Sequence, residues 1–303
     1  MYFSRIKYII ILVLWPCLSL SQSKLDAFFT SSDTLNKPRL KAVVATEATL
    51  GTLTIIGLNQ LWYSDFERSK FQTINDNQEW LQMDKLGHVF TSYQLGKHGA
   101  QLLDWSGVSE KHQLVYGATL GFTFLAAVEV LDGYSAEWGF SWGDILANGA
   151  GTGLYVGQEL LWKEQRIALK YSFRQTEFAA LRPDKLGGTF AEQILKDYNG
   201  QTYWLSANLS SFFKNSQIPK WLNIAVGYGG QGMLSGTKDI DNQVLTTNSR
   251  YRQYYLSFDL NLSAIKTKSK WLSSVFEVVN MIKVPFPALE FNKKGAVFHL
   301  LHY

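Results

Sequence analysis

The stretch QLVYGATLGFTFLAAVEVL, from Gln113 to Leu131, decides the fold class of the first half of the chain. It contains no proline, and no charged residue occurs before Glu129. A helix of this length, close to the ~20 residues that cross the hydrocarbon core of a bilayer, is typical of a membrane span or of a buried bundle helix. We therefore expect an apolar helix that contacts lipid or other apolar helices.

Three further apolar segments flank this stretch, and proline interrupts none of them. They run from Leu40 to Trp62, from Lys85 to Leu103 and from Trp142 to Trp162. Each has about the length of a membrane span, ~17 to 25 residues, although Glu47, Lys97 and His98 make the first two less apolar. Together the four segments predict an N-terminal bundle of about four apolar helices, which we expect to be embedded in a membrane.

Glycines recur at intervals of four on two of these segments. Gly117 and Gly121 lie on the third segment, and Gly149, Gly153 and Gly157 lie on the fourth. Residues four apart share one face of a helix, and small residues at this spacing let two helices approach closely in lipid. We expect the glycine faces of these two helices to pack against each other.

Beyond Lys163 the hydrophobic pattern changes from a helical period to alternation. Alternating segments are RIALKYSFR (166–174), QTYWLSANLSSF (201–212) and YYLSFDLNL (254–262), with GYGGQGM (227–233) and GAVFHLLHY (295–303) as further candidates. Alternation with one apolar face predicts antiparallel strands, and short helices are expected near 192–198 and 271–282. The predicted fold class is α+β, with helices first and a β-rich antiparallel region after them.

The alternating strands are compatible with two environments. Outer-membrane sheets turn their apolar face toward lipid, whereas an antiparallel sheet with one wet face hides its apolar face in a core. The sequence leaves both open. About five candidate strands are fewer than the ~8 of the smallest bacterial barrels, which counts against an independent pore.

The N-terminus predicts export. Arg5 and Lys7 precede an apolar run, Tyr8 to Leu20, and small residues at a cleavage position follow it. The single cysteine, Cys17, lies inside this predicted signal peptide, so we expect no disulfide in the mature protein. The tetrapeptide LWPC departs from a lipobox because Trp15 and Pro16 stand where small residues are needed; lipidation is left open.

We expect a signal peptide (1–21), a polar linker (22–39), a membrane-associated helical domain (40–163) and a β-rich domain (164–303).

The composition indicates which partners to expect. Charged residues make up 18% of the chain against a typical ~25%, while aromatic residues reach 15%, a pairing that suits a membrane interface. The net charge of +4 is spread along the chain without a basic stripe, so nucleic acid is not an expected partner. We expect a membrane lipid or another envelope component as partner, in the periplasm or at the outer membrane. The sequence identifies no protein partner.

Polar residues gather at the ends of three predicted helices. Asp84 and His88 share one stripe because residues four apart are ~40° apart around a helix, and Asp144 and Asn148 do likewise on the fourth helix. Glu129 ends the uncharged run of the third helix. The full predicted binding cluster is Asp84, Lys85, Asp132, Ser141, Asp144 and Asn148, with His88 and Glu129 as candidate acid and base.

The charges of this cluster do not balance. Four carboxylates would face only Lys85 and a histidine, and charged groups near a bilayer cost on the order of 2.5 to 3.5 kcal/mol each. Solvent access, raised carboxylate pKa values or a bound cation could each resolve this. One histidine among carboxylates suits a hard or borderline ion, but the spacing matches no strong metal motif. The metal and any other cofactor are left open.

Each polar residue also has a structural explanation. Asp84 is expected to cap its helix, which is worth roughly 1 kcal/mol, and Ser141 could cap the fourth helix in the same way. His88 could be a structural histidine, Lys85 a solvated side chain, and Asp144 with Asn148 a link between helices. The sequence shows no obvious nucleophile, so whether the protein is an enzyme is left open.

The motifs MDKLGHVF (83–90), EVLDGYSAEWGFSWGDILANGAG (129–151), LKDYNGQTYWLSANL (195–209) and PKWLNIAVGYGGQGM (219–233) resemble the YfiM-like family of predicted periplasmic lipoproteins of unknown function. The resemblance extends from about Gln78 to the end of the chain. The first half also resembles the VanZ-like membrane family in its order of Asp-Lys-x-x-His, Glu and Ser-x-x-Asp-x-x-x-Asn, although Asp132, Gly133 and Trp138 depart from it. Both resemblances imply an envelope location, and neither implies an established activity.

From these observations we expect an exported envelope protein with a structural or binding role at a membrane, and with the polar cluster as its binding site. The alternative is a membrane-embedded enzyme that acts on a lipid or cell-wall substrate through His88 and Glu129.

Overall fold

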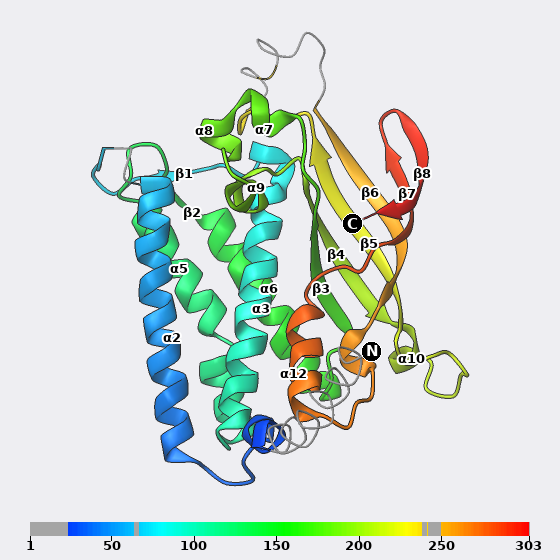
Figure 1. Ribbon diagram of the computed structural model, residues 1–303. Coiled ribbons are helices and arrows are strands. Elements are labelled where there is room, and N and C mark those ends of the chain that lie inside the picture. The colour runs from blue at the N-terminus through cyan, green and yellow to red at the C-terminus, as the bar shows by residue number, and fades with distance from the viewer. Residues whose placement is uncertain (1–23, 64–66, 238–240, 242–249, 303) are drawn as a thin grey trace, which may run out of the picture.

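The computed structural model describes residues 24–63, 67–237, 241 and 250–302. The chain is α+β, with the long helices first and an antiparallel sheet after them (Figure 1), as the sequence predicts. The expected signal peptide and Cys17 lie outside the described residues.

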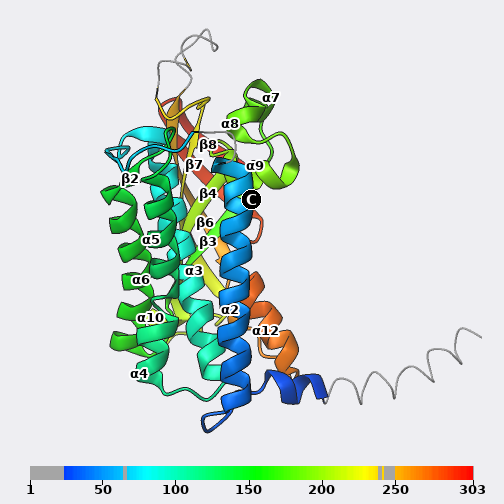
Figure 2. The ribbon, with the colours of Figure 1, turned by 90° about the vertical axis from the view of Figure 1, so that its left-hand side faces the viewer.

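Four long helical elements run side by side along one direction (Figure 2). They are α2 (Lys37–Leu58, followed by the π-helical turn η1, Asn59–Tyr63), α3 (Met83–Trp105), the run of α4 (Glu110–His112), η3 (Gln113–Gly117) and α5 (Leu120–Asp132), and α6 (Trp142–Trp162). Only two of these elements, Lys37–Leu58 and Glu110–Asp132, are long and apolar enough to cross a membrane. The expectation of about four such helices is therefore wrong for α3 and α6, which carry polar and charged residues along their buried faces.

The predicted glycine packing is also wrong. Gly117 and Gly121 do lie at close helix contacts, but they contact α3 instead of α6. A Cβ added at Gly121 would lie 2.2 Å from the carbonyl oxygen of Ser92. Gly153 and Gly157 have no atom within 4 Å of such a Cβ, so their face of α6 is open. The central helix of the bundle is therefore α3, which contacts both α5 and α6.

This difference gives a matched pair of substitutions. Gly121→Ala should destabilise the protein by about 1 to 3 kcal/mol, because the added methyl group overlaps the backbone of α3. Gly153→Ala should instead stabilise it by about 0.5 to 1 kcal/mol, because alanine favours helix and meets no neighbour. Urea unfolding in detergent followed by tryptophan fluorescence compares the two variants. Equal effects would contradict the packing of α5 on α3.

The second half forms a six-stranded sheet in the order β3-β4-β5-β6-β7-β8, with every neighbouring pair antiparallel. The strands are β3 (Ile167–Phe173), β4 (Gln201–Asn208), β5 (Leu222–Gln231), β6 (Tyr251–Leu260), β7 (Phe286–Asn292) and β8 (Gly295–His302). The connecting elements are α7 (Phe178–Leu181), α8 (Pro183–Leu186), α9 (Phe190–Lys196), α10 (Leu209–Phe212), η4 (Leu262–Ala264) and α12 (Lys270–Val279). Strand β7 is not among the strands predicted from the sequence; prolines 285 and 287 lie beside and within it, and proline is unfavourable in a strand pattern.

The sheet is strongly curled. Trp204 on β4 contacts His302 on β8 with ring centroids 5.7 Å apart, although four strand spacings in a flat sheet would separate them by ~19 Å. At the first edge, the backbone N–H of Tyr171 on β3 donates to Met281, and that of Lys283 donates back to Tyr171, both at 2.9 Å. The segment leading into β7 therefore pairs with the outer edge of β3.

The two faces of this curled sheet are opposite in polarity to those of a sheet in water. Lys170 and Asp259 on the inner face are fully buried, at 0% exposure. On the outer face, Val226 and Phe258 are each 51% exposed. Helix α3 covers only the part of the outer face on β3 and β4, where Phe90 packs against tyrosine side chains. The segment around Leu81 covers Tyr228 and Gly230 at one end of β5, and Val226, Tyr254, Leu256, Phe258, Leu289 and Phe291 of the apolar side are exposed.

Candidate functional site

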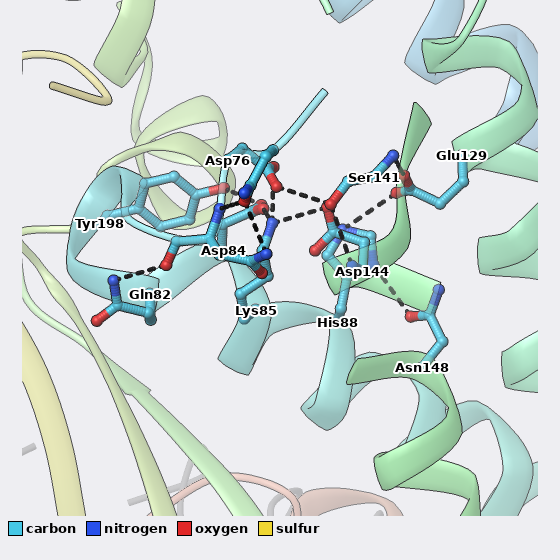
Figure 3. A network of polar contacts seen from close by, with 12 residues as sticks. Asp76, Gln82, Asp84, Lys85, His88, Glu129, Ser141, Asp144, Asn148 and Tyr198 are labelled. Atoms are coloured by element: carbon cyan, nitrogen blue, oxygen red, sulfur yellow. Dashed lines mark hydrogen bonds and ion pairs between the residues drawn. The ribbon is translucent and has the colours of Figure 1, made fainter. Parts of the chain in front are cut away.

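Three helix ends meet at one end of the bundle: the N-termini of α3 and α6 and the C-terminus of α5 (Figures 1 and 3). The short parallel pair of β1 (Thr73–Ile74) and β2 (Phe140–Ser141) lies beside them. The chain enters α3 through the 3₁₀ turn η2 (Glu79–Gln82), where Trp80, Leu81 and Gln82 all have positive φ angles of 46°, 54° and 66°. Non-glycine residues in this conformation cost about 1 to 2 kcal/mol each. Contacts with surrounding residues must therefore hold the turn η2 in this conformation.

The two expected helix caps have different outcomes. Ser141 caps α6 as predicted, since its Oγ accepts a hydrogen bond from the backbone N–H of Asp144 at 3.2 Å. The predicted cap of α3 by Asp84 is wrong, because the N-cap position is Gln82 and Asp84 lies inside the first turn. Asp84 instead accepts a hydrogen bond from the Tyr198 hydroxyl at 2.8 Å.

Lys85 is the cation at the centre of the cluster. Its Nζ donates to Asp76 Oδ2 at 2.6 Å, to Asp144 Oδ2 at 2.8 Å and to Asp84 Oδ2 at 3.2 Å (Figure 3). Its side chain is only 13% exposed. The prediction that Lys85 is a solvated side chain is therefore wrong. Lys85 links α3 to α6 and to the loop before η2.

His88 lies on the other side of Asp144. Its Nδ1 is 3.0 Å from Asn148 Oδ1. Its Nε2 faces two carboxylate oxygens, Glu129 Oε1 and Asp144 Oδ1, each at 3.6 Å. These last separations are too long for hydrogen bonds. The structure thus brings together the histidine and carboxylates that the sequence placed on three separate helices.

The α5 carboxylates have separate surroundings. Glu129 is 2% exposed, and its Oε2 accepts a hydrogen bond from the backbone N–H of Ser141 at 3.1 Å. Asp132 accepts a hydrogen bond from the Tyr63 hydroxyl at 2.5 Å. Tyr63 also lines a pocket of about 580 Å³ between α2 and the end of α5. The cluster is therefore linked to this pocket through Tyr63, which lines it and donates to Asp132.

Three residues of the site were missed from the sequence: Asp76, Tyr63 and Tyr198. Asp76 accepts hydrogen bonds from both Lys85 and Ser141, at 2.6 and 2.7 Å. It lies in a polar loop without periodicity, and Tyr198 comes from the connection between α9 and β4. No local pattern marks these residues, because only the tertiary fold brings them to the helix ends.

The pKa values of the groups on α3 and α6 follow from burial opposed by neighbouring charges. Burial would raise the pKa of Asp84, but His88 and Lys85 hold it below its usual range. Burial would lower the pKa values of Lys85 and His88, but the surrounding carboxylates, Asp84 first, raise both above their usual values. Burial, together with the charge of Asp84, raises the pKa of Asp144 to about 6. Asp144 is thus the carboxyl of this pair that takes up a proton first as pH falls.

The structure adds one carboxylate to the four expected from the sequence, while burial raises the pKa of Glu129 to about 8 and so reduces its charge near neutral pH. Five carboxylates (Asp76, Asp84, Glu129, Asp132 and Asp144) surround Lys85 and His88. The positive ends of α3 and α6 favour Asp84 and Asp144 in their first turns, whereas the C-terminus of α5 gives Glu129 no such help. Asp84, His88 and Asp144 each offer an atom within 4.8 Å of the others, so they could hold a metal ion.

These features define a helical protein with an acidic site at one end of its helices. Residues 74–158 match the family model described as "Predicted periplasmic lipoprotein (DUF2279)", and these residues carry most of the cluster. The match agrees with an exported cell-envelope location. No curated protein and no solved structure matches the chain. The matched residues end within α6, so the YfiM-like resemblance of the second half and the VanZ-like resemblance stay predictions.

Proposed function

We propose that this protein is seated in a membrane of the cell envelope, where the polar cluster at one end of its helices binds a ligand. The observation that carries the membrane placement is the sheet, whose apolar face is turned outward and whose polar face is enclosed. In water this arrangement leaves apolar surface exposed, and each Å² of it loses about 25 cal/mol of the free energy that burial would contribute. In lipid the same arrangement is the favourable one.

The dimensions of the elements support this placement. Helix α2 has 22 residues, which gives about 33 Å at 1.5 Å per residue and matches a hydrocarbon core of ~30 Å. Val43 is its one buried residue, so most of its surface is free to contact acyl chains. Strands β5 and β6 have 10 residues each, within the ~9 to 11 of a spanning strand. In this proposal the helical region (40–163) and the β-rich region (164–303) share one membrane.

The binding role rests on the surroundings of the cluster. The pocket that Tyr63 lines has apolar side chains from Ile55, Ile56 and Leu131 and polar groups from Glu67 and Arg68 in its lining. A pocket of this mixed character suits an amphiphilic molecule. A membrane lipid or another envelope component is therefore the proposed partner. The YfiM-like resemblance supports the envelope location and adds no activity.

The catalytic alternative for His88 and Glu129 stays a prediction. His88→Ala and Glu129→Gln should abolish an activity while the protein still folds and reaches the envelope, if the cluster is catalytic. Loss of both variants from the envelope would instead indicate a structural role for these residues.

Spin labels test the membrane placement. Because the chain has one cysteine, Cys17, a Cys17→Ser background allows single labels at Leu256 on the outer face, at Leu160 on α6 and at the exposed Asp184. In vesicles, labels at the two leucines should collide more often with dissolved oxygen than with a water-soluble nickel chelate. The Asp184 label should show the reverse. Equal nickel accessibility at all three sites would overturn the proposal.

A charge on the outer face should weaken membrane retention. Leu256 is 40% exposed on β6, and a lysine on a lipid-facing strand costs about 2 to 4 kcal/mol at the bilayer midplane and about 0 to 1 near the interface. Leu256→Lys should therefore increase the fraction released by urea from membranes. Leu181→Lys is the matched control, since Leu181 is 49% exposed on the short helix α7. Equal release of both variants and wild type would contradict a lipid-facing β6.

A further inference from the structure

Two carboxylate oxygens, one on α5 and one on α6, lie at the same distance from one ring nitrogen of His88 on α3. When His88 Nδ1–H donates to Asn148 Oδ1 at 3.0 Å, the neutral ring keeps a lone pair on Nε2. That lone pair faces Glu129 Oε1 and Asp144 Oδ1, each 3.6 Å away. Both carboxylate oxygens thus face an unprotonated nitrogen, and the arrangement requires a positive group there, either a proton on the ring or a cation.

Asp144 shows this requirement most clearly. It is 3% exposed, and among the described residues its Oδ1 has no hydrogen-bond partner. Lys85 binds the other oxygen, Oδ2, from the opposite side. A buried carboxylate oxygen without a donor is unfavourable, because it has lost its hydration without gaining a hydrogen bond. Lys85 makes no hydrogen bond to Oδ1. A cation that satisfies Oδ1 would therefore lie on the His88 side of the carboxylate.

The distances fit a metal ion better than a proton. An imidazolium that donates to a carboxylate does so at about 2.7 to 2.9 Å, well below the 3.6 Å found from His88 Nε2 to both oxygens. Two ligands that each lie about 2.1 to 2.2 Å from one ion at tetrahedral angles are ~3.4 to 3.6 Å apart. The observed separations match that spacing. Asp84 places a further carboxylate oxygen within 4.8 Å of the His88 and Asp144 donors.

We propose that His88 Nε2, Asp144 Oδ1 and a carboxylate oxygen of Asp84 bind one divalent transition-metal cation, with Glu129 as the neighbouring fourth acidic group. An imidazole nitrogen favours Zn²⁺ over Mg²⁺ and Ca²⁺, which prefer an all-oxygen set, and the carboxylates of the site also suit Mn²⁺. Asn148 Oδ1 accepts a hydrogen bond from His88 Nδ1–H and so fixes the orientation of the ring, as the hydrogen-bond partner of a metal-binding histidine does. The metal ion is then the ligand of the binding cluster proposed above. This inference rests on that binding role and does not depend on the membrane placement.

Metal binding by the full chain tests this inference. The protein is purified in detergent with a tag free of histidine, stripped with a chelator, and titrated with Zn²⁺ and separately with Mn²⁺. Wild type should bind one equivalent of at least one of these ions, and Mg²⁺ or Ca²⁺ in tenfold excess should not displace it. His88→Ala and Asp144→Asn should each weaken binding at least 10-fold.

His98→Ala is the matched control. His98 is a second partly buried histidine on α3, and its Nδ1 contacts Gln101 instead of a carboxylate. Its substitution should leave the affinity within twofold of wild type. Circular dichroism and vesicle flotation of each variant show that the fold and the membrane association persist, so a failure of metal binding is distinguishable from a failure of the proposed membrane role.

X-ray absorption of the Zn²⁺-loaded protein supplies a second readout. The expected first shell is one imidazole nitrogen with two or three carboxylate oxygens at about 2.0 to 2.2 Å. A wild type that binds no equivalent of either ion, a shell without imidazole, or equal weakening by His98→Ala and His88→Ala would each overturn the proposal.

Discussion

Replacing Asp259 by alanine should lower the free energy of unfolding by about 3 to 5 kcal/mol. Asp259 Oδ2 lies 2.7 Å from Lys170 Nζ, its Oδ1 lies 4.0 Å from Lys283 Nζ, and all three side chains are 0% exposed. It also accepts a hydrogen bond from Ser206 at 2.7 Å. Its removal would leave two ammonium groups inside the curled sheet without a counter-charge.

Unfolding by urea in detergent, followed by tryptophan fluorescence, measures this loss. The double variant Lys170→Met with Asp259→Leu should recover part of the stability, since it removes a charge together with its partner. Asp184→Ala is the surface control: Asp184 pairs with Arg182 but is 64% exposed, so its loss should cost less than about 1 kcal/mol. A loss for Asp259→Ala no larger than for Asp184→Ala would show that the inner face is not enclosed.

Lys85→Met should have the second large effect, again about 3 to 5 kcal/mol of unfolding free energy. Lys85 is the shared donor to Asp76, Asp84 and Asp144 at 2.6, 3.2 and 2.8 Å. Methionine keeps most of the volume of the side chain but removes the charge, so the three carboxylates would repel one another across the helix ends.

Lys163→Met is the matched control for this variant. Lys163 follows α6 and pairs with Glu110, but its side chain is 60% exposed, so its replacement should cost less than about 1 kcal/mol. The same urea titration compares the two. Equal losses for both lysines would mean that Lys85 is not needed to hold α3 and α6 together.

The sequence predicts the helices and most strands well because these depend on local periodicity. The uncharged run from Gln113 and the alternation around Tyr254 each report a local preference. Strand β7 escapes this reasoning because two prolines lie in or beside it, and only its pairing with β6 and β8 makes it a strand. Alternation also shows that one face is apolar without showing which face turns inward. The exposed position of Phe258 could therefore be found only from the curled sheet.

The candidate site is predictable where residues share a helix. Asp84 and His88 are four apart, and Asp144 and Asn148 likewise, so helical geometry alone places each pair on one face. Their convergence with Glu129 depends on how α5 crosses α3 and α6, which no local pattern encodes. The capping prediction for Asp84 failed for a related reason. Residues with positive φ angles precede α3, so the N-cap lies at Gln82, and the Asp84 carboxylate accepts a hydrogen bond from Tyr198 instead.

The polarity of the sheet also bears on how the chain reaches its final state. A sheet that is inside-out with respect to water gains nothing from hydrophobic collapse in an aqueous compartment, because collapse would hide Val226 and Phe258 and expose Lys170 and Asp259. Curling around the polar interior becomes favourable only when the outer face has an apolar surface to meet. For a membrane-seated protein, folding and insertion would then be one coupled event. A chain held in buffer should wait in an open, aggregation-prone form until lipid or detergent is supplied.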